Sequence, residues 1–265
     1  MVELTKKELV SINVDILREI HSFCKENKIV YSLYYGTLIG AVRHKGFIPW
    51  DDDVDIVMPR PCYERFIRTY KSTGKYKLFA CEIDNSYILP IGRLADTTTL
   101  KIEESSSGYN IGIAVDIFPV DGLPENNNFM HRFKLMFWRN AFRFKGTILF
   151  KKGRLWYKSL FVGMIKIVLS PFPLSFICRT LNNVAKEYPF DSSINVCSYL
   201  SPYREKDITE KTTFDSIIAV EFEGSSFNAV ADYDKCLRKL YGDYMQLPPI
   251  DKRVSDHDAK FFKLI

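Results

Sequence analysis

The sequence lacks the features that mark secreted and membrane-spanning proteins. Its six cysteines are scattered and include no Cys-x-x-Cys pair, which argues against a zinc site and against a disulfide framework. Residues 1–19 mix acids and bases in a helical pattern, so no cleaved signal peptide is expected. The most apolar stretch, residues 160–177, contains Lys166 and two prolines and falls short of the roughly 20 apolar residues of a spanning helix. We therefore expect a cytoplasmic protein with reduced thiols.

Acidic residues are missing from one long stretch. Residues 126–186 contain no Asp or Glu but twelve of the 37 Lys and Arg residues, which leaves 25 basic against 32 acidic residues elsewhere. The net charge of +5 therefore conceals an acidic body with a balance of −7 and a basic middle segment. Cations alternate there with aromatic residues, as in Phe137-Trp138-Arg139 and Trp156-Tyr157-Lys158. This composition favours an interfacial helix on an anionic membrane surface. The alternative is a set of packed helices with a solvated basic face.

Nucleic acid is the competing polyanion for the basic segment. A nucleic-acid-binding protein would carry a recognised reading module or a row of stacking aromatics on strands, and neither is evident in the sequence. We therefore expect no nucleic-acid partner.

Hydrophobic periodicity predicts both helices and strands in a chain whose 46% apolar content can form a sizeable core. Thr5 and Glu8 form a capping box at the start of an amphipathic helix. Strands are predicted at 29–35, 53–58, 76–83, 87–94 and 111–118, with helices at 37–44, 62–71 and 228–241 and longer ones after 126. We expect an α+β fold with a mixed β-sheet flanked by helices, plus a basic helical elaboration. Its parts would be a catalytic core (1–125), a basic aromatic helical segment (126–190) and a C-terminal part (191–265) that packs back on the core.

The segment from Trp50 to Met58 contains four aspartates in six positions. Side chains alternate along a strand, so Asp51, Asp53 and Asp55 share one face and apolar side chains occupy the other. Carboxylates this close repel one another unless a cation lies between them, and Mg²⁺ prefers such oxygen ligands. A solvated acidic turn is the alternative, and the apolar opposite face weakens it.

Two other metal-binding motifs share this pattern. An EF-hand that began at Asp51 would need Gly at position 56 and Glu at position 62, where the sequence has Ile56 and Cys62. The D-x-D motif of nucleotide-sugar glycosyltransferases would follow a nucleotide-binding half, and barely fifty residues precede the acids. Neither motif fits its context.

A Gly-Thr pair precedes the acids at a predicted junction of strand and helix. Gly36 lets a phosphate approach the backbone, the helix N-terminus offers free N–H groups, and Thr37 adds a hydroxyl, although an ordinary turn would look the same. Such a phosphate cradle followed by D-x-D is what two-metal phosphoryl or nucleotidyl transfer requires. Asp116 follows on a predicted strand whose small neighbours leave room, as a third ligand or as the base for the attacking hydroxyl.

These residues resemble the LicD family, which is related to fukutin and has a nucleotidyltransferase fold. Residues 35–56 are similar to its signature, and residues 114–122 and 241–249 to its later motifs, so the resemblance spans most of the chain. It implies a Mg²⁺-dependent phosphotransferase, with Mn²⁺ as a substitute. The enzyme would move phosphocholine, or ribitol or another polyol phosphate, from a CDP-linked donor such as CDP-choline to a hydroxyl of a surface glycan. That acceptor would be a teichoic acid, capsule or lipopolysaccharide, lipid-linked where it is built on a carrier.

The resemblance also implies roles for individual residues. The metal ligands would be Asp53 and Asp55, with Asp51 nearby and Asp116 as the third acid. Two sets of residues would bind the donor. The phosphates would be contacted by Gly36, Thr37, Arg43, His44, Lys45 and Arg93. The choline headgroup would have Trp50, Tyr34 and Tyr35 as cation–π partners. The alternative to phosphate binding is structural: Arg43, His44 and Lys45 would pair with the dipole of the short helix that they end, and Arg93 would be a charge on the surface of a strand.

Two other functions stay open at this level. The same fold serves nucleotidyltransferases that act on small molecules, and a protein with a vestigial site would simply bind a polyanion or a membrane. We expect a cytoplasmic location, peripheral on the inner face of the cell membrane.

Overall fold

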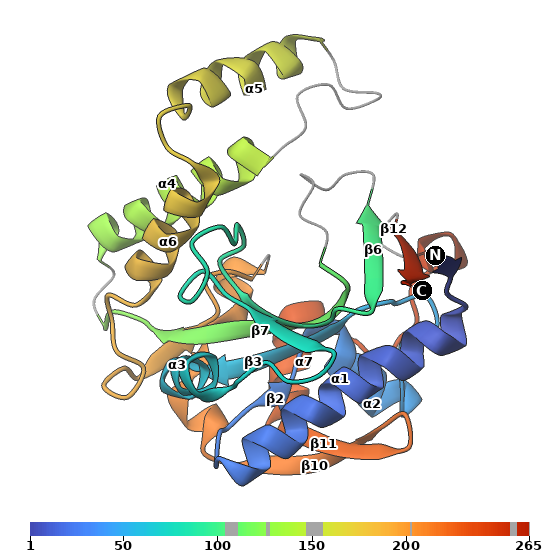
Figure 1. Cartoon of the computed structure of the whole chain (residues 1–265). Coiled ribbons are helices and arrows are strands. Elements are labelled where there is room, and N and C mark those ends of the chain that lie inside the picture. Colours follow the sequence, from blue (N-terminus) through green and yellow to red (C-terminus); the bar gives the residue numbers. More distant parts are fainter. Residues whose placement is uncertain (104–110, 126–127, 147–155, 202, 255–258, 265) are drawn as a thin grey trace.

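A mixed β-sheet forms the centre of the computed structural model, which describes residues 1–103, 111–125, 128–146, 156–201, 203–254 and 259–264 (Figure 1). Its strands β3 and β7 run parallel, and their other neighbours run antiparallel. The order across the sheet is β2 (Ser32–Leu33), β3 (Val54–Pro59), β7 (Ile113–Gly122), β5 (Gly92–Asp96) and β4 (Tyr76–Phe79), with β8 (Asn195–Cys197) on β7 and β9 (Thr209–Glu210) on β8.

Helices pack against this sheet, and their apolar faces form the core. The capping box at Thr5 starts α1 (Lys6–Glu26), which buries Leu9, Ile16 and Ile20. α1 and α3 (Arg60–Thr69) lie against β7, while α2 (Tyr35–His44) lies against β3 and contacts α7 (Tyr233–Tyr241). The predicted α+β fold with a mixed sheet flanked by helices is confirmed.

Two smaller sheets complete the body. The hairpin of β10 (Ile217–Phe222) and β11 (Ser225–Val230) packs on β2, and the sheet of β1 (Val2–Glu3), β12 (Ala259–Lys263) and β6 (Thr99–Glu103) brings the two chain ends together (Figure 1). Short 3₁₀ turns lie at Arg204–Asp207, Lys211–Phe214 and Ile250–Lys252.

Several predicted elements are shifted in the structure. The strand expected at 29–35 is reduced to β2, because the backbone of Tyr35 has a φ of 46° and already begins α2. The strand expected at 87–94 begins only at Gly92, after Pro90, which has no N–H to donate to a ladder. The helix expected at 228–241 begins at Tyr233, because residues 225–230 form β11 after a turn at Glu223 and Gly224 with positive φ angles.

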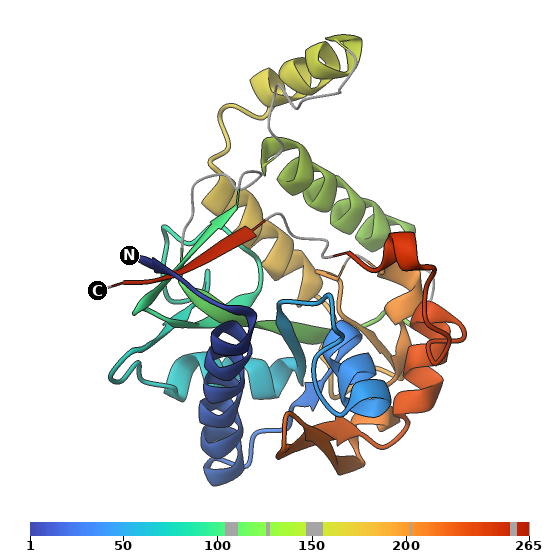
Figure 2. The same cartoon turned by 90° about the vertical axis from the view of Figure 1, so that its right-hand side faces the viewer.

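Three helices form an arm that projects from the body (Figures 1 and 2). These are α4 (Phe129–Gly146), α5 (Trp156–Val168) and α6 (Leu174–Ala185), and α5 lies at the outer end. α4 and α6 pack side by side through Leu135, Leu181 and Val184. Within the described residues, no helix combines the length and the apolar content that crossing a bilayer requires.

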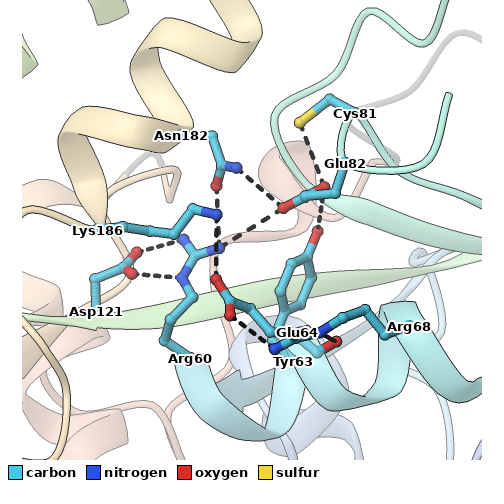
Figure 3. A network of polar contacts seen from close by, with 9 residues as sticks. All are labelled: Arg60, Tyr63, Glu64, Arg68, Cys81, Glu82, Asp121, Asn182 and Lys186. Carbon is cyan, nitrogen blue, oxygen red and sulfur yellow. Dashed lines mark hydrogen bonds and ion pairs between the residues drawn. The ribbon is translucent and has the colours of Figure 1, made fainter. Parts of the chain in front are cut away.

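A buried polar network joins the arm to the body (Figure 3). Arg60 at the start of α3 forms two hydrogen bonds to the carboxylate of Asp121 on β7, at 2.5 and 2.7 Å. A third bond runs from Arg60 to the Oδ1 of Asn182 on α6, and Asn182 donates to Glu82. Lys186, just after α6, pairs with Glu64. The side chains of Arg60, Asp121 and Asn182 are almost fully buried, so the charges are compensated within the protein.

Candidate active site

A pocket of about 730 Å³ opens where β3, β7 and α2 meet the segment that follows α7, and its volume is typical of small-molecule sites. Carboxylates line one end, and aromatic, basic and aliphatic side chains line most of the rest. The lining residues include Tyr35, Gly36, Arg43, Trp50, Asp51, Asp53, Asp55, Asp116, Phe118, Tyr203, Tyr241, Asp243, Gln246 and Lys252.

The acidic end of the pocket is built by two parallel strands. Asp55 on β3 is paired in register with Asp116 on β7, so their side chains leave the same face of the sheet. Asp51 and Asp53 lie in the loop before β3 rather than in a strand, but they line the same pocket. Carboxylate oxygens of Asp51, Asp52 and Asp53 lie within 4.8 Å of one another. The four predicted acids therefore come together, although strand alternation places only Asp55.

Electrostatics at this end of the pocket favour a bound cation. Burial and the neighbouring Asp53 raise the pKa of Asp51 to about 8. Burial, followed by the charges of Asp53, Asp116 and Asp51, raises the pKa of Asp55 well above its ordinary value. Such carboxylates hold protons unless a positive ion replaces them, and hard divalent cations favour an all-oxygen set. The donor set fits Mg²⁺.

Two further residues hold these acids in place. Arg93 on β5 donates two hydrogen bonds to the carboxylate of Asp116, at 2.6 and 2.8 Å. The hydroxyl of Thr37, which is buried, accepts a 2.9 Å hydrogen bond from the backbone N–H of Asp55. Neither Arg93 nor Thr37 lines the pocket, so the structure gives both residues a positioning contact rather than direct access to a ligand.

The first turn of α2 lies beside the acids because Gly36 has no side chain. A Cβ at this position would come within 2.8 Å of the Oδ2 of Asp51. Tyr35 precedes it with a left-handed backbone, which costs free energy in a residue other than glycine. The Tyr35 hydroxyl donates a 2.6 Å hydrogen bond to the buried Asp207, and its ring stacks on Tyr203. These contacts hold the strained residue at the wall of the pocket.

The three predicted phosphate-clamping cations are placed differently from one another. Arg43 lines the pocket and donates to the backbone carbonyl of Tyr244. His44 accepts a hydrogen bond from Arg43, and Lys45 is an exposed C-cap, so neither lines the pocket. Lys252, which was not predicted, does line it. Lys252 lies far from the acids in the sequence, so apart from the motif at 241–249 no local sequence pattern indicated that it belongs to the site.

Comparison with known proteins agrees with this geometry. Residues 28–162 match the model of the LicD/FKTN/FKRP nucleotidyltransferase domain. The lipopolysaccharide cholinephosphotransferase LicD of Haemophilus influenzae is 32% identical over 97% of each chain. The chain belongs to the LicD family. Uncharacterized proteins of Rickettsia typhi and Rickettsia prowazekii are 42% and 49% identical over short segments, which cover 20% and 16% of this chain and 17% and 15% of theirs. The predicted class of enzyme, a transferase, is confirmed.

Aromatic rings line the remaining wall of this LicD-family pocket. Of the three predicted rings, Tyr35 and Trp50 line it, while Tyr34 is buried behind it. The guanidinium of Arg253 lies 5.8 Å from the centroid of Trp50, so this ring face already receives a cation. Tyr203 and Tyr241, which were not predicted, join through their hydroxyls at 2.7 Å and complete the wall.

Proposed function

We propose that this LicD-family protein transfers phosphocholine from CDP-choline to a hydroxyl of a cell-surface glycan in a Mg²⁺-dependent reaction. The observation that carries the proposal is the convergence of Asp51, Asp53, Asp55 and Asp116 at one end of a pocket of substrate size. The similarity to a lipopolysaccharide cholinephosphotransferase along nearly the whole chain supports both the transferred group and a lipopolysaccharide-type acceptor.

The same four aspartates would hold the metal, and Mn²⁺ would fit this oxygen set as well. A divalent ion bound there would neutralise the diphosphate of the donor and stabilise the leaving CMP. The bidentate contact from Arg93 fixes the orientation of Asp116 beside Asp55, which keeps the two carboxylates aligned for a common ligand.

Protein groups around the acids would position the reactants. Arg43 and Lys252 add positive charge to the wall of the pocket, where they would bind the donor phosphates. The absence of a side chain at Gly36 allows a phosphate to approach the first turn of α2. A carboxylate of the cluster would accept the proton of the acceptor hydroxyl as the oxygen attacks in line.

The composition of the wall favours a cationic headgroup over a polyol. A quaternary ammonium group has no hydrogen to donate and binds to aromatic faces. Trp50, Phe118 and Tyr241 line the pocket, and Asp243 adds a carboxylate. A polyol would instead need hydrogen-bonding partners for each of its hydroxyls.

CMP release tests the proposal directly. The purified protein is incubated with lipopolysaccharide, Mg²⁺ and one donor at a time, either CDP-choline or CDP-ribitol. We expect CMP with CDP-choline and none after EDTA treatment. Turnover of CDP-ribitol alone would replace choline with a polyol, and release of diphosphate from CTP and phosphocholine would identify a nucleotidyltransferase. Asp215→Asn, which changes an exposed carboxylate outside the pocket, is the control and should retain full activity.

A further inference from the structure

The arm exposes an unusual amount of apolar surface. Of the 25 large apolar side chains that are exposed among the described residues, 14 lie between positions 129 and 176. α5 alone buries only Ser159 and Val162, whereas Trp156 and Ile167 are 77% and 74% exposed. A helix of the protein body does the opposite, since α1 directs its apolar side chains inward. The outer surface of α5 is therefore not explained by packing within the chain.

The exposed side chains of α5 form one continuous stripe. At 100° per residue they all fall within an arc of about 140° on the helix surface. Lys158 lies about 60° beyond one edge of this arc, whereas Lys166 lies on the opposite side of the helix with Ser159 and Val162. The stripe consists of Trp156, Tyr157, Leu160, Phe161, Met164, Ile167 and Val168.

A second stripe lies on α4 and meets the first. Phe129, Phe133 and Phe137 are spaced by four residues, and neighbouring rings stack at centroid distances of 6.3 and 6.4 Å. All three rings are exposed. Phe144 at the end of α4 contacts Phe161 at the edge of the α5 stripe, with the ring centroids 6.3 Å apart. The arm therefore exposes apolar surface on both helices, which touch through this pair of rings.

We propose that this surface docks the protein on an anionic lipid bilayer, with α5 lying in the interface and the body outside it. The inference does not depend on the proposed reaction. An interfacial helix combines an apolar face rich in Trp, Phe and Leu with lysines at its edges, whose stems reach the phosphates. The complete absence of Asp and Glu from residues 126–186 matches a negative surface.

Other occupants fit this surface less well. Two copies of α5 would bring its lysines together with no carboxylate on that helix to compensate them. A nucleic acid would meet a largely apolar stripe instead of a row of cations. α5 lies at the outer end of a projecting arm, away from the central sheet (Figures 1 and 2).

Vesicle flotation tests the proposal on the full chain without substrates. We expect the protein to float with vesicles of phosphatidylcholine and phosphatidylglycerol at 3:1. The double variant Leu160→Glu/Ile167→Glu should bind the vesicles at least about tenfold more weakly than the wild type, since two charges would enter the interface. The matched control Ile83→Glu/Ile194→Glu makes the same change at exposed sites outside the arm and should bind like the wild type. Equal binding by all three proteins, or no binding by the wild type, would overturn the proposal.

Charge and depth give two independent readouts. Lys158→Gln should lower binding to the anionic vesicles by about fivefold, and Lys166→Gln, on the side of the helix opposite the stripe, should lower it less. Trp156 should be quenched by brominated lipid, and Trp156→Phe should remove most of this quenching. Thermal unfolding midpoints equal to the wild type would show that the variants fold. Self-association in ultracentrifugation without lipid, abolished by Leu160→Glu/Ile167→Glu, would assign the surface to a second copy of the chain and refute the bilayer.

Discussion

The body and the arm treat their apolar side chains in opposite ways, since the helices of the body bury them and the outer helix of the arm exposes them. In the body, α1 buries Leu9, Ile16 and Ile20 against the sheet, and the charges of the pocket are held by partners such as Arg93. In the arm, α5 turns most of its apolar side chains outward. The contrast indicates that the body is complete as a folded unit, whereas the surface of the arm is shaped for something outside the chain.

The largest expected effect is a loss of activity in the body that leaves vesicle binding by the arm unchanged. Asp55→Asn should lower phosphotransfer by about 1000-fold or more, because a charged ligand worth several kcal/mol in the transition state is lost. The folded protein should be no less stable without Mg²⁺, since burial and neighbouring acids already disfavour the ionised form of Asp55. CMP release, the thermal midpoint and vesicle flotation measure the three properties. Loss of vesicle binding in this variant would mean that the arm and the site are not independent.

The next effect concerns the body side of the buried network, where Arg60 of α3 pairs with Asp121 of β7. Asp121→Leu leaves the buried guanidinium of Arg60 without its carboxylate and should cost about 3 to 5 kcal/mol of unfolding free energy in urea. Arg60→Met/Asp121→Leu removes both charges and should recover much of the loss. Arg68→Met, which removes a cation from an exposed pair, should change stability by less than about 1 kcal/mol. A small loss for Asp121→Leu would show that this ion pair contributes little to the stability of the fold.

A pH series examines the body alone. Burial raises the pKa of Asp207 from 3.8 to about 6, against hydrogen bonds from Tyr35 and Ser201 and the charges of Lys239 and Arg139. Because the folded value is the higher one, the stabilisation from this group is fully present below about pH 4 and is lost as the pH rises through 6. Relative to Asp207→Asn, the wild type should lose about 2 kcal/mol between pH 4 and 7. A constant difference between the two proteins across this range would contradict the assignment.

The smallest effect lies within the site. Gly36→Ala places a methyl group against the Oδ2 of Asp51, and this flexible carboxylate can swing away at little cost in stability. We expect the Mg²⁺ concentration for half-maximal activity to rise about tenfold, because changes to residues that orient metal ligands typically weaken metal binding by this factor or more. Gly146→Ala, where a Cβ meets nothing within 4 Å, is the matched control. Equal Mg²⁺ requirements in both variants would place Asp51 outside the metal set.

The sequence predicted those parts of the site that depend on local order. Gly36 on α2, Asp51 and Asp53 in the loop before β3, and Asp55 on β3 lie within 20 residues of one another, so their spacing in the sequence was sufficient to group them. Tyr203, Tyr241 and Lys252 reach the pocket from segments about 150 to 200 positions further along the chain, and their approach depends on tertiary packing. The predicted tail helix began too early because residues 225–230 pair with β10 through a turn that no periodicity reveals.

The arm shows the converse limit. Its charge bias was visible in composition, but exposure is a property of packing, and only the structure shows that Trp156 and Ile167 are 77% and 74% exposed. The predicted division of the chain at residues 126 and 190 stays a prediction.

The register of β3 and β7 also bears on how the protein acquires its activity. Asp55 faces Asp116 across a parallel pair that closes a loop of about sixty residues, and such long-range closure is slow compared with helix formation. A nascent or partly folded chain therefore lacks the complete carboxylate set, even when α1 and α2 have formed. If the four aspartates hold Mg²⁺ as proposed, the ion would bind the native state in preference to its precursors and would stabilise that state by mass action. Recovery of turnover during refolding should consequently lag behind recovery of helical signal.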